Sequence, residues 1–288
     1  MDGFIALYKP PGLSSQQAVS RVRRLLNIKK AGHTGTLDPA AEGLLLIGLN
    51  KATRLNEYLL SSAKEYRAVV RFGLATDSGD RDGIVIQRQN SFILASQQIE
   101  EALAKFRGTI QQTPPTTSAI KIQGRRAYEL HRSGQEFAMP SREVTIYQLE
   151  RLSSLRTIDP ANPRMAIRVL CSKGTYIRSL AIDLGKTLGC PAFLEALVRT
   201  KVGGVALSQA RRLADLPHNP GILPLEEAVK ELPWVDLAQV QQKEDFLHGR
   251  AQALVMVDTA LVAVFSLGIL LGIGRIEGGI LRPNKVFG

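Results

Sequence analysis

The chain has 288 residues, 44% of them hydrophobic, which is enough to bury the core of one large domain and a smaller one. It carries 37 Lys and Arg against 26 Asp and Glu, and the resulting net charge of +11 is not confined to a tail. This pattern predicts a folded protein whose surface meets a polyanion, a nucleic acid before a membrane. A basic protein without such a partner is the alternative.

The cysteines and the N-terminus indicate a cellular compartment. Cys171 and Cys190 have no metal-ligand spacing and cannot make a disulfide framework, so we expect a reducing environment. The opening MDGFIALYKPPG lacks the basic and apolar regions of a signal peptide. Residues 261–274 are uncharged, but they are too few and too rich in glycine to span a bilayer, and they predict paired strands. We therefore expect a cytoplasmic protein that does not enter a membrane.

The first elements lead to a loop that holds one aspartate. A strand over residues 4–12 ends in a Pro-Gly turn, and Ser14 or Ser15 can cap the following helix. In the loop over 32–44, GHTGTLDPAAEGL, glycines permit close backbone approaches and Pro39 prevents a helix through Asp38. The apolar LLLIGL predicts a buried strand behind it. We interpret Asp38 as a functional carboxylate at the rim of a cleft; the alternative is an Asp-Pro turn between two elements.

The next segments predict an alternation of helices and strands. We expect a helix over about residues 51–62 and a strand over 64–73. The polar stretch 75–83 lacks the register and terminal Glu of an EF-hand, so we interpret it as a solvated hairpin connection. A helix with Ile99, Leu103 and Phe106 on one face should end with Gly108 as its C-cap.

Residues 111–142 are expected to form a basic insertion. Two adjacent prolines and two glycines break its pattern, and its cations suit a clamp on a phosphate backbone. The alternative is an ordinary exposed helix and loop. The cations of this insertion are Lys121, Arg125, Arg126 and Arg132.

The second half of the chain continues the same pattern. Strands are expected over residues 143–155, 164–171 and 192–204. Between the last two, the chain should turn at Gly174 into a helix that ends at Gly189 and carries Arg178 in its first turns. A linker rich in Leu and Pro follows, and the tail from about Trp234 predicts further strands.

These motifs resemble, in the same order, the bacterial tRNA pseudouridine-55 synthases of the TruB type. The matching stretches are KPPGLSS, GHTGTLDPAAEGLL, KEYRA, GTYIRSLAIDLG and LVRTKVG. The resemblance implies an α+β pseudouridine synthase fold, with a long mixed, mostly antiparallel sheet flanked by helices and loops. It also implies a catalytic domain over residues 1–232 and a small PUA-like β module for RNA binding over 233–288. Thr117, in PPTTSA, departs from the family's usual Tyr, which puts one contact near the bound RNA in question.

The resemblance also implies roles for particular residues. Asp38 would be the catalytic carboxylate, either as a nucleophile or as a base, and Arg178 would pair with it. Tyr66 would stack on the flipped uracil and take part in proton transfer. The residues that would line the pocket or the RNA cleft are His33, Tyr176 and Leu197.

The function implied is isomerisation of the T-loop uridine at position 55 of tRNA, after the base is flipped out. The reaction needs no metal and no cofactor, and the enzyme would act as a monomer without an obligatory protein partner. Three alternatives remain: a non-catalytic RNA-binding protein on the same scaffold, a related synthase that works in a guide-RNA complex, and a glycosidase with Glu42 as its second carboxylate.

Overall fold

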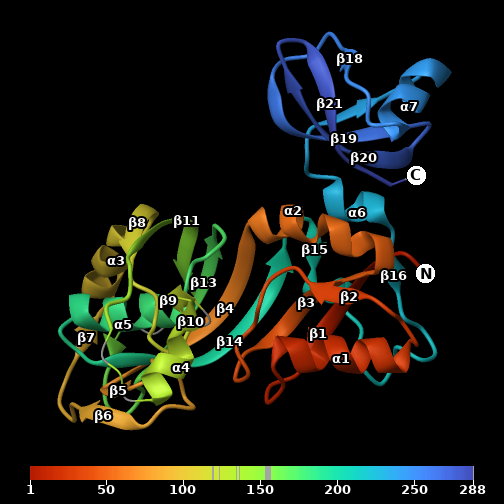
Figure 1. Ribbon diagram of the computed structural model, residues 1–288. Coiled ribbons are helices and arrows are strands. Elements are labelled where there is room, and N and C mark those ends of the chain that lie inside the picture. Colours follow the sequence, from red (N-terminus) through yellow and green to blue (C-terminus); the bar gives the residue numbers. More distant parts are fainter. Residues whose placement is uncertain (119, 123, 134, 136, 153–156, 288) are drawn as a thin grey trace.

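Residues 1–118, 120–122, 124–133, 135, 137–152 and 157–287 are described by a computed structural model (Figure 1). Among these residues, ten strands form one large sheet and five strands near the C-terminus form a second sheet. The second sheet lies beyond α2 (Asn56–Ser61) and α6 (Leu225–Val229), at the top of Figure 1. No helix of the described residues is both long and apolar enough to cross a membrane.

The large sheet is mixed and mostly antiparallel, as the family resemblance implied. Its path runs through β16 (Ile222–Leu223), β1 (Gly3–Lys9), β3 (Glu42–Leu49), β14 (Ala192–Val202), β4 (Lys64–Phe72), β13 (Arg164–Cys171), β11 (Arg142–Arg151) and β8 (Gly108–Gln112). Two short strands extend it, β2 (Ala31–His33) on β3 and β15 (Val205–Ala206) on β14. Within the described residues, β3 and β14 form its parallel pair.

The close approach of β3 to β14 depends on a glycine. Gly43 has a φ of +105°, and a Cβ built on it would lie 2.4 Å from the carbonyl oxygen of Arg199. Any side chain there would push the strands apart, so Gly43 allows residues 42–43 to pair with Val198 and Arg199. This pairing brings the start of β3, directly after the Asp38 loop, against the middle of β14.

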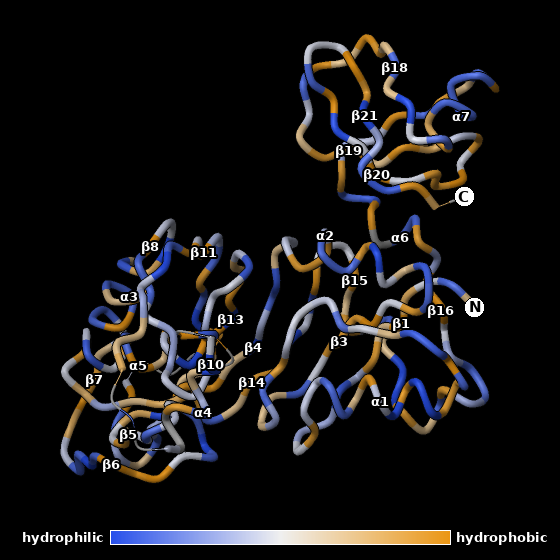
Figure 2. Tube along the Cα trace, viewed as in Figure 1, coloured by the Kyte–Doolittle hydropathy of each residue, from blue (hydrophilic) through white to orange (hydrophobic). Residues whose placement is uncertain are grey.

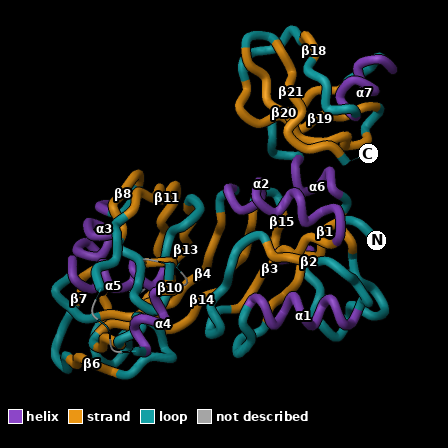
Figure 3. Tube along the Cα trace, viewed as in Figure 1, coloured by secondary structure: helices purple, strands orange, loops and turns teal. Residues whose placement is uncertain are grey.

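Helices cover the two halves of the sheet separately. α1 (Ser15–Leu25) packs its Ala18, Val19 and Val22 against the apolar strands β1 and β3, which are coloured as hydrophobic in Figure 2. Ser14 caps α1 and forms a capping box with Gln17. At the other half, α3 (Ser96–Lys105) and α5 (Ile177–Thr187) pack on β4, β13 and β11 (Figure 3).

The remaining elements are short. They are the 3₁₀ helices over Asn50–Leu55 and Leu207–Gln209, the hairpins β5 (Leu74–Thr76) with β6 (Val85–Arg88) and β9 (Lys121–Ile122) with β10 (Arg125–Arg126), the pair β7 (Leu94–Ala95) with β12 (Thr157–Ile158), and α4 (Ala127–Arg132). The helix expected over 51–62 is therefore a 3₁₀ turn followed by α2. The predicted C-cap was wrong: α3 is capped by Phe106, and Gly108 begins β8. The end of the strand expected over 143–155 lies outside the described residues from position 153 on.

The C-terminal sheet has the order β17 (Trp234–Asp236), β19 (Thr259–Ser266), β20 (Ile269–Glu277), β21 (Ile280–Val286) and β18 (Gln252–Ala253). The stretch 261–274 forms the paired strands β19 and β20, as predicted. α7 (Val240–Leu247) buries Phe246 against this sheet. Polar contacts join it to the first part of the chain: Arg54 donates to the Val286 carbonyl, and Lys285 donates to the Arg54 carbonyl.

Candidate active site

The loop that carries Asp38 is a turn with a partly exposed carboxylate. The Ala41 N–H donates to the Asp38 carbonyl at 3.1 Å, so the Asp-Pro turn is present. The Asp38 side chain is 36% exposed, and it lines a pocket of about 530 Å³. The turn and the carboxylate at the rim of a cleft are therefore the same feature, and the two interpretations do not exclude each other.

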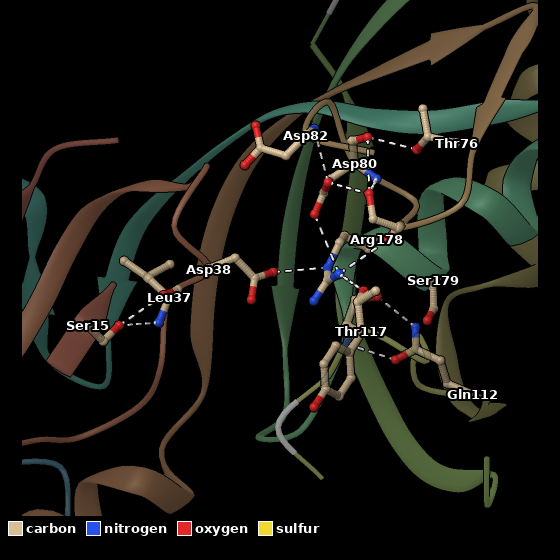
Figure 4. A network of polar contacts seen from close by, with 12 residues as sticks. Ser15, Leu37, Asp38, Thr76, Asp80, Asp82, Gln112, Thr117, Arg178 and Ser179 are labelled. Carbon is tan, nitrogen blue, oxygen red and sulfur yellow. Dashed lines mark hydrogen bonds and ion pairs between the residues drawn. The ribbon is translucent and has the colours of Figure 1, made fainter. Parts of the chain in front are cut away.

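Buried polar side chains hold the loop on both sides of Asp38. The Ser15 hydroxyl accepts from the Leu37 N–H at 2.8 Å and donates to the Leu37 carbonyl at 2.9 Å (Figure 4). The ammonium group of Lys9 is fully buried and donates to the carbonyls of Pro10, Leu13 and Pro39. These contacts restrain the backbone immediately before and after Asp38.

Arg199 holds the loop from beneath. It is 1% exposed, and it donates to the carbonyls of Leu44 at 2.7 Å, Gly35 at 3.0 Å and Thr36 at 3.2 Å. A buried cation is costly unless it is hydrogen-bonded, and here backbone carbonyls supply the acceptors. Because β14 places Arg199 next to Gly43, the strand pairing fixes the loop as well.

Burial shifts the pKa of two lysines near the loop. Burial lowers the Lys9 pKa to about 8, partly opposed by Asp38. Burial also lowers the Lys64 pKa to about 8, and the Arg199 charge adds to this. Lys64 donates to the carbonyls of Leu59, Leu60 and Ser62. Both lysines thus donate hydrogen bonds to nearby backbone carbonyls, and both are easier to deprotonate than a free lysine.

Arg178 is a buried arginine shared between two carboxylates. It is 4% exposed, so the alternative of a surface helix arginine is excluded. Its Nε lies 3.0 Å from Asp38 Oδ2, an ion pair without the alignment of a hydrogen bond. Its Nη1 lies 3.5 Å from Asp80 Oδ2. Asp38 is thus the more exposed of two carboxylates that one guanidinium neutralises, since Asp80 is 13% exposed (Figure 4).

The stretch 75–83 is a hairpin connection, as predicted, but it is solvated only in part. Asp77, Arg81 and Asp82 are exposed, whereas Thr76, Gly79 and Asp80 are buried. The carbonyl of Ser78 accepts from Arg178 Nη1 at 3.1 Å, and the Asp80 carboxylate accepts from the Ser78 hydroxyl at 2.6 Å. Gly79, with a φ of +73°, allows this approach, because a Cβ there would lie 2.7 Å from Ile182 of α5. The connection therefore packs on α5 and forms part of the site.

Tyr66 forms a wall of the pocket. It lies on β4, is 9% exposed, and its pKa is raised chiefly by burial. Its hydroxyl therefore stays protonated at neutral pH. Leu197 on β14 and Tyr176 before α5 line the same pocket. An apolar side chain and two aromatic rings beside one ion-paired carboxylate suit a flat, partly polar ligand.

Arg142 lines the pocket beside Tyr176, and Gln112 holds the backbone of Tyr176 from outside the pocket lining. The Arg142 guanidinium lies 5.2 Å from the centre of the Tyr176 ring, a cation–π contact. The buried Gln112 accepts from the Tyr176 N–H at 2.7 Å and donates to its carbonyl at 3.0 Å. The cations that line the pocket are Lys64, Arg142, Lys173, Arg178 and Arg199. This surplus of positive charge favours an anionic ligand.

Some residues singled out from the sequence lie elsewhere. His33 is in β2 and outside the pocket lining, where its ring accepts from the Gly35 N–H and its pKa is lowered by burial and by Arg199. In the insertion, Lys121, Arg125 and Arg126 are exposed and do not line the pocket, and the side chain of Arg132 is outside the described part.

Glu42 is engaged away from the pocket. Its Oε2 accepts from the Tyr8 hydroxyl at 2.5 Å, and it does not line the pocket with Asp38. The arrangement of paired carboxylates that a glycosidase requires is therefore not formed by Asp38 and Glu42. In the described part of the chain, no three His, Cys, Asp or Glu side chains gather as a metal-binding group.

The chain matches one protein family and relatives that share about 40% of its sequence. Residues 23–177 match the family described as TruB family pseudouridylate synthase (N terminal domain). The chain is 40% identical over 292 residues to a tRNA pseudouridine synthase B of Azoarcus sp. (strain BH72), covering 99% of this chain and 95% of the relative. It is 41% identical over 300 residues to a tRNA pseudouridine synthase B of Synechocystis sp. (strain ATCC 27184 / PCC 6803 / Kazusa), covering 99% of both.

Solved structures show the same fold over nearly the whole chain. One chain in the crystal structure of a Cbf5-Nop10-Gar1 complex aligns with a TM-score of 0.77 and 28% identity, over 99% of this chain and 85% of the other. Another, from an H/ACA RNP bound to a substrate RNA containing 2'-deoxyuridine, aligns with a TM-score of 0.75 and 26% identity, over 99% and 85%. The chain belongs to the TruB family of pseudouridylate synthases.

Proposed function

We propose that this pseudouridylate synthase acts on tRNA and isomerises the T-loop uridine at position 55. The observation that carries the proposal is the ion pair between Arg178 and Asp38, 3.0 Å apart, at a pocket of about 530 Å³ that Tyr66 also lines. The names of relatives at 40% and 41% identity over almost the full chain support tRNA as the substrate. The T-loop position rests on the motif resemblance.

The chemistry needs a carboxylate and no redox step. The C1′–N1 bond of uridine breaks, the uracil turns, and a C1′–C5 bond forms; N1 gains a proton and C5 loses one. Asp38 either attacks the substrate covalently or takes a proton from the ribose. Both routes require the carboxylate to be ionised, and the Arg178 guanidinium lies 3.0 Å away as its counter-charge.

Arg178 also orients the carboxylate. The planar guanidinium fixes directions as well as charge, and its Nη1 is held by Ser78 while its Nε faces Asp38. Asp80 competes for the same cation at 3.5 Å. A position fixed to within a fraction of an ångström is what a reaction at the ribose requires.

We assign to Tyr66, which lines the pocket, stacking on the uracil and a part in proton transfer through its hydroxyl. A T-loop uridine is stacked in the folded tRNA, and extruding it costs a few kcal/mol. Contacts between Lys or Arg and phosphates can offset that cost. Arg142 and Lys173 at the pocket, and Lys121, Arg125, Arg126 and Arg132 in the insertion, are the cations we assign to these contacts.

We further propose that residues 1–232 form the catalytic domain and residues 233–288 an RNA-binding module, and that the protein acts as a monomer without a protein partner. The resemblance of the tail and the separate C-terminal sheet support this division. Ending the chain before Trp234 should leave a folded, slower enzyme. An insoluble product, or a folded product that is fully inactive, would contradict the division.

The decisive experiment uses the purified full-length chain and a tRNA transcript. We expect pseudouridine at position 55, measured by release of the C5 hydrogen and by mapping, with no guide RNA or added protein. Asp38→Asn should abolish isomerisation and leave tRNA affinity within about tenfold, ~1.4 kcal/mol.

Asp183→Asn is the matched control. Asp183 lies on α5 and pairs with Lys186 at 3.3 Å, away from the pocket lining, so the same change of charge there should preserve turnover. Appreciable turnover by Asp38→Asn would remove Asp38 from the mechanism. Modification that depends on a guide RNA would replace the proposal with the guide-RNA alternative.

A further inference from the structure

The insertion contributes a side chain to the arginine of the site. Arg178 Nη1 donates to the hydroxyl oxygen of Thr117 at 2.6 Å (Figure 4). This is shorter than the distances from the guanidinium to Asp38, Ser78 and Asp80, which are 3.0, 3.1 and 3.5 Å. Thr117 is the position at which this chain departs from the Tyr usual in the family.

The backbone that presents Thr117 is itself fixed on α5. The Gln112 side chain is hydrogen-bonded to both the N–H and the carbonyl of Tyr176. The Ser179 hydroxyl donates to the Thr113 carbonyl at 2.7 Å. Beyond the two prolines, the Ser118 N–H donates to the Pro115 carbonyl and closes a turn around Thr117. The hydroxyl therefore reaches Arg178 from a restrained turn.

The direction of the guanidinium depends on what holds Nη1. The group is planar, so acceptors at Nη1 set where Nε points. Ser78 and Asp80 both belong to the 75–83 connection and draw Nη1 toward that side. Thr117 draws it from the insertion instead, on a short side chain whose hydroxyl is carried by Cβ.

We propose that Thr117 is a positioning residue, which holds the Arg178 guanidinium so that Nε faces Asp38 instead of turning toward Asp80. The proposal rests on the proposed function of the Asp38 site. It links the RNA-contacting insertion directly to the ion pair at the reacting carboxylate.

The first test compares near-isosteric variants. Thr117→Val removes the hydroxyl at nearly constant volume, and we expect the single-turnover rate to fall about tenfold, the effect of losing one hydrogen bond to a charged group. The tRNA dissociation constant should change less than about twofold. Thr117→Ser, which keeps the hydroxyl, should restore the rate, and Thr116→Val is the neighbouring control that should leave it unchanged.

The second test asks whether Thr117 acts through Arg178. In an Arg178→Lys background the fork is absent, so adding Thr117→Val should have no further effect on the rate. A wild-type rate in Thr117→Val, equal losses in both backgrounds, or a loss wholly in tRNA affinity would each overturn the proposal. So would a Ser variant as slow as the Val variant.

A third readout does not depend on turnover. With ¹⁵N-labelled arginine, the Arg178 Nε–H signal should be protected from solvent exchange in the wild type and in Thr117→Ser, and exposed in Thr117→Val. Equal protection in all three would overturn the positioning role. Rates are taken on whichever RNA the wild type modifies, so a wrong tRNA assignment and a wrong role for Thr117 give different results.

Discussion

The Asp38 loop and the insertion over residues 111–142 use basic residues in opposite ways. At the Asp38 loop, Lys9 and Arg199 are buried, and each donates its hydrogen bonds to backbone carbonyls of the loop or of neighbouring residues. In the insertion, Lys121 and Arg125 are exposed on a short hairpin and meet solvent. Burial thus decides whether a cation fixes geometry or supplies charge to a ligand.

This contrast teaches that net charge alone says little about the mechanism. The buried cations cannot reach a phosphate without leaving their carbonyls, which would cost about 1–3 kcal/mol for each acceptor left unpaired. The exposed cations can move to a polyanion at little cost. Substitutions in the two regions should therefore change different measured quantities, the rate at the loop and the affinity in the insertion.

The largest effect is expected at the ion pair between Arg178 and the Asp38 loop. Arg178→Lys keeps the positive charge but loses the planar fork, so it can neutralise Asp38 without orienting it. The single-turnover rate should fall by two or more orders of magnitude, roughly 3 kcal/mol in the barrier, with tRNA affinity nearly unchanged. Near wild-type turnover would reduce Arg178 to a charge partner. Tyr66→Phe is the companion measurement, because it keeps the ring and removes only the hydroxyl.

An intermediate effect is expected from the cations of the insertion. Neutralising Lys121, Arg125, Arg126 and Arg132 together should weaken tRNA binding by about tenfold or more. It should also make the negative slope of log affinity against log salt less steep, by about 1 to 3, since each phosphate contact releases counterions. The rate at saturating tRNA should change little. Filter binding at several salt concentrations measures both quantities.

The control carries the same loss of charge elsewhere. The exposed cations Arg88, Lys105, Lys186 and Lys230 do not line the pocket. Neutralising these four should leave the salt slope closer to that of the wild type. Equal slopes in both quadruple variants would show that the insertion contributes only to net charge and does not touch the RNA.

The smallest effect concerns stability and pH at Lys9. Its pKa is about 8 in the folded state and near 10.5 in the unfolded chain, so above pH 8 the unfolded state binds more protons and wild-type stability rises with pH. Lys9→Met lacks this contribution. The wild type minus variant difference in unfolding free energy should therefore grow by about 1 kcal/mol between about pH 7 and about pH 9. Denaturant titrations at several pH values measure it, and a pH-independent difference would contradict the shifted pKa.

Much of the fold could be predicted from the sequence because its signals are local. Apolar runs gave the buried strand after Asp38, and alternation gave β4. Asp80 could not be found in this way, because a short stretch rich in Asp and Gly has the composition of a solvated turn. Asp80 is buried where the connection packs on α5, so closely that a Cβ on Gly79 would lie 2.7 Å from Ile182, more than a hundred positions later in the chain.

Arg199 was missed for a related reason. It stands within a motif that the sequence did reveal, yet an arginine in a strand is usually exposed. The available signal was an arginine in a run otherwise rich in apolar residues, and only the parallel pairing of β14 with β3 shows which carbonyls it meets. For Thr117, the sequence showed only that Thr stands where the family usually has Tyr. Its contact with Arg178 depends on the fold of the insertion and could not be predicted.

The hold of Arg199 on the loop has a consequence for the order of assembly. Arg199 donates to the carbonyl of Leu44, 155 positions earlier in the chain. Closing so long a segment is entropically costly, so this contact should form late in folding. During synthesis the loop around Asp38 leaves the ribosome long before its anchor, and we expect it to remain unfixed until β14 is made. Nascent chains halted before and after β14 has emerged from the ribosome would differ in protection of the loop from proteolysis. The loop would therefore acquire its final geometry only late in translation.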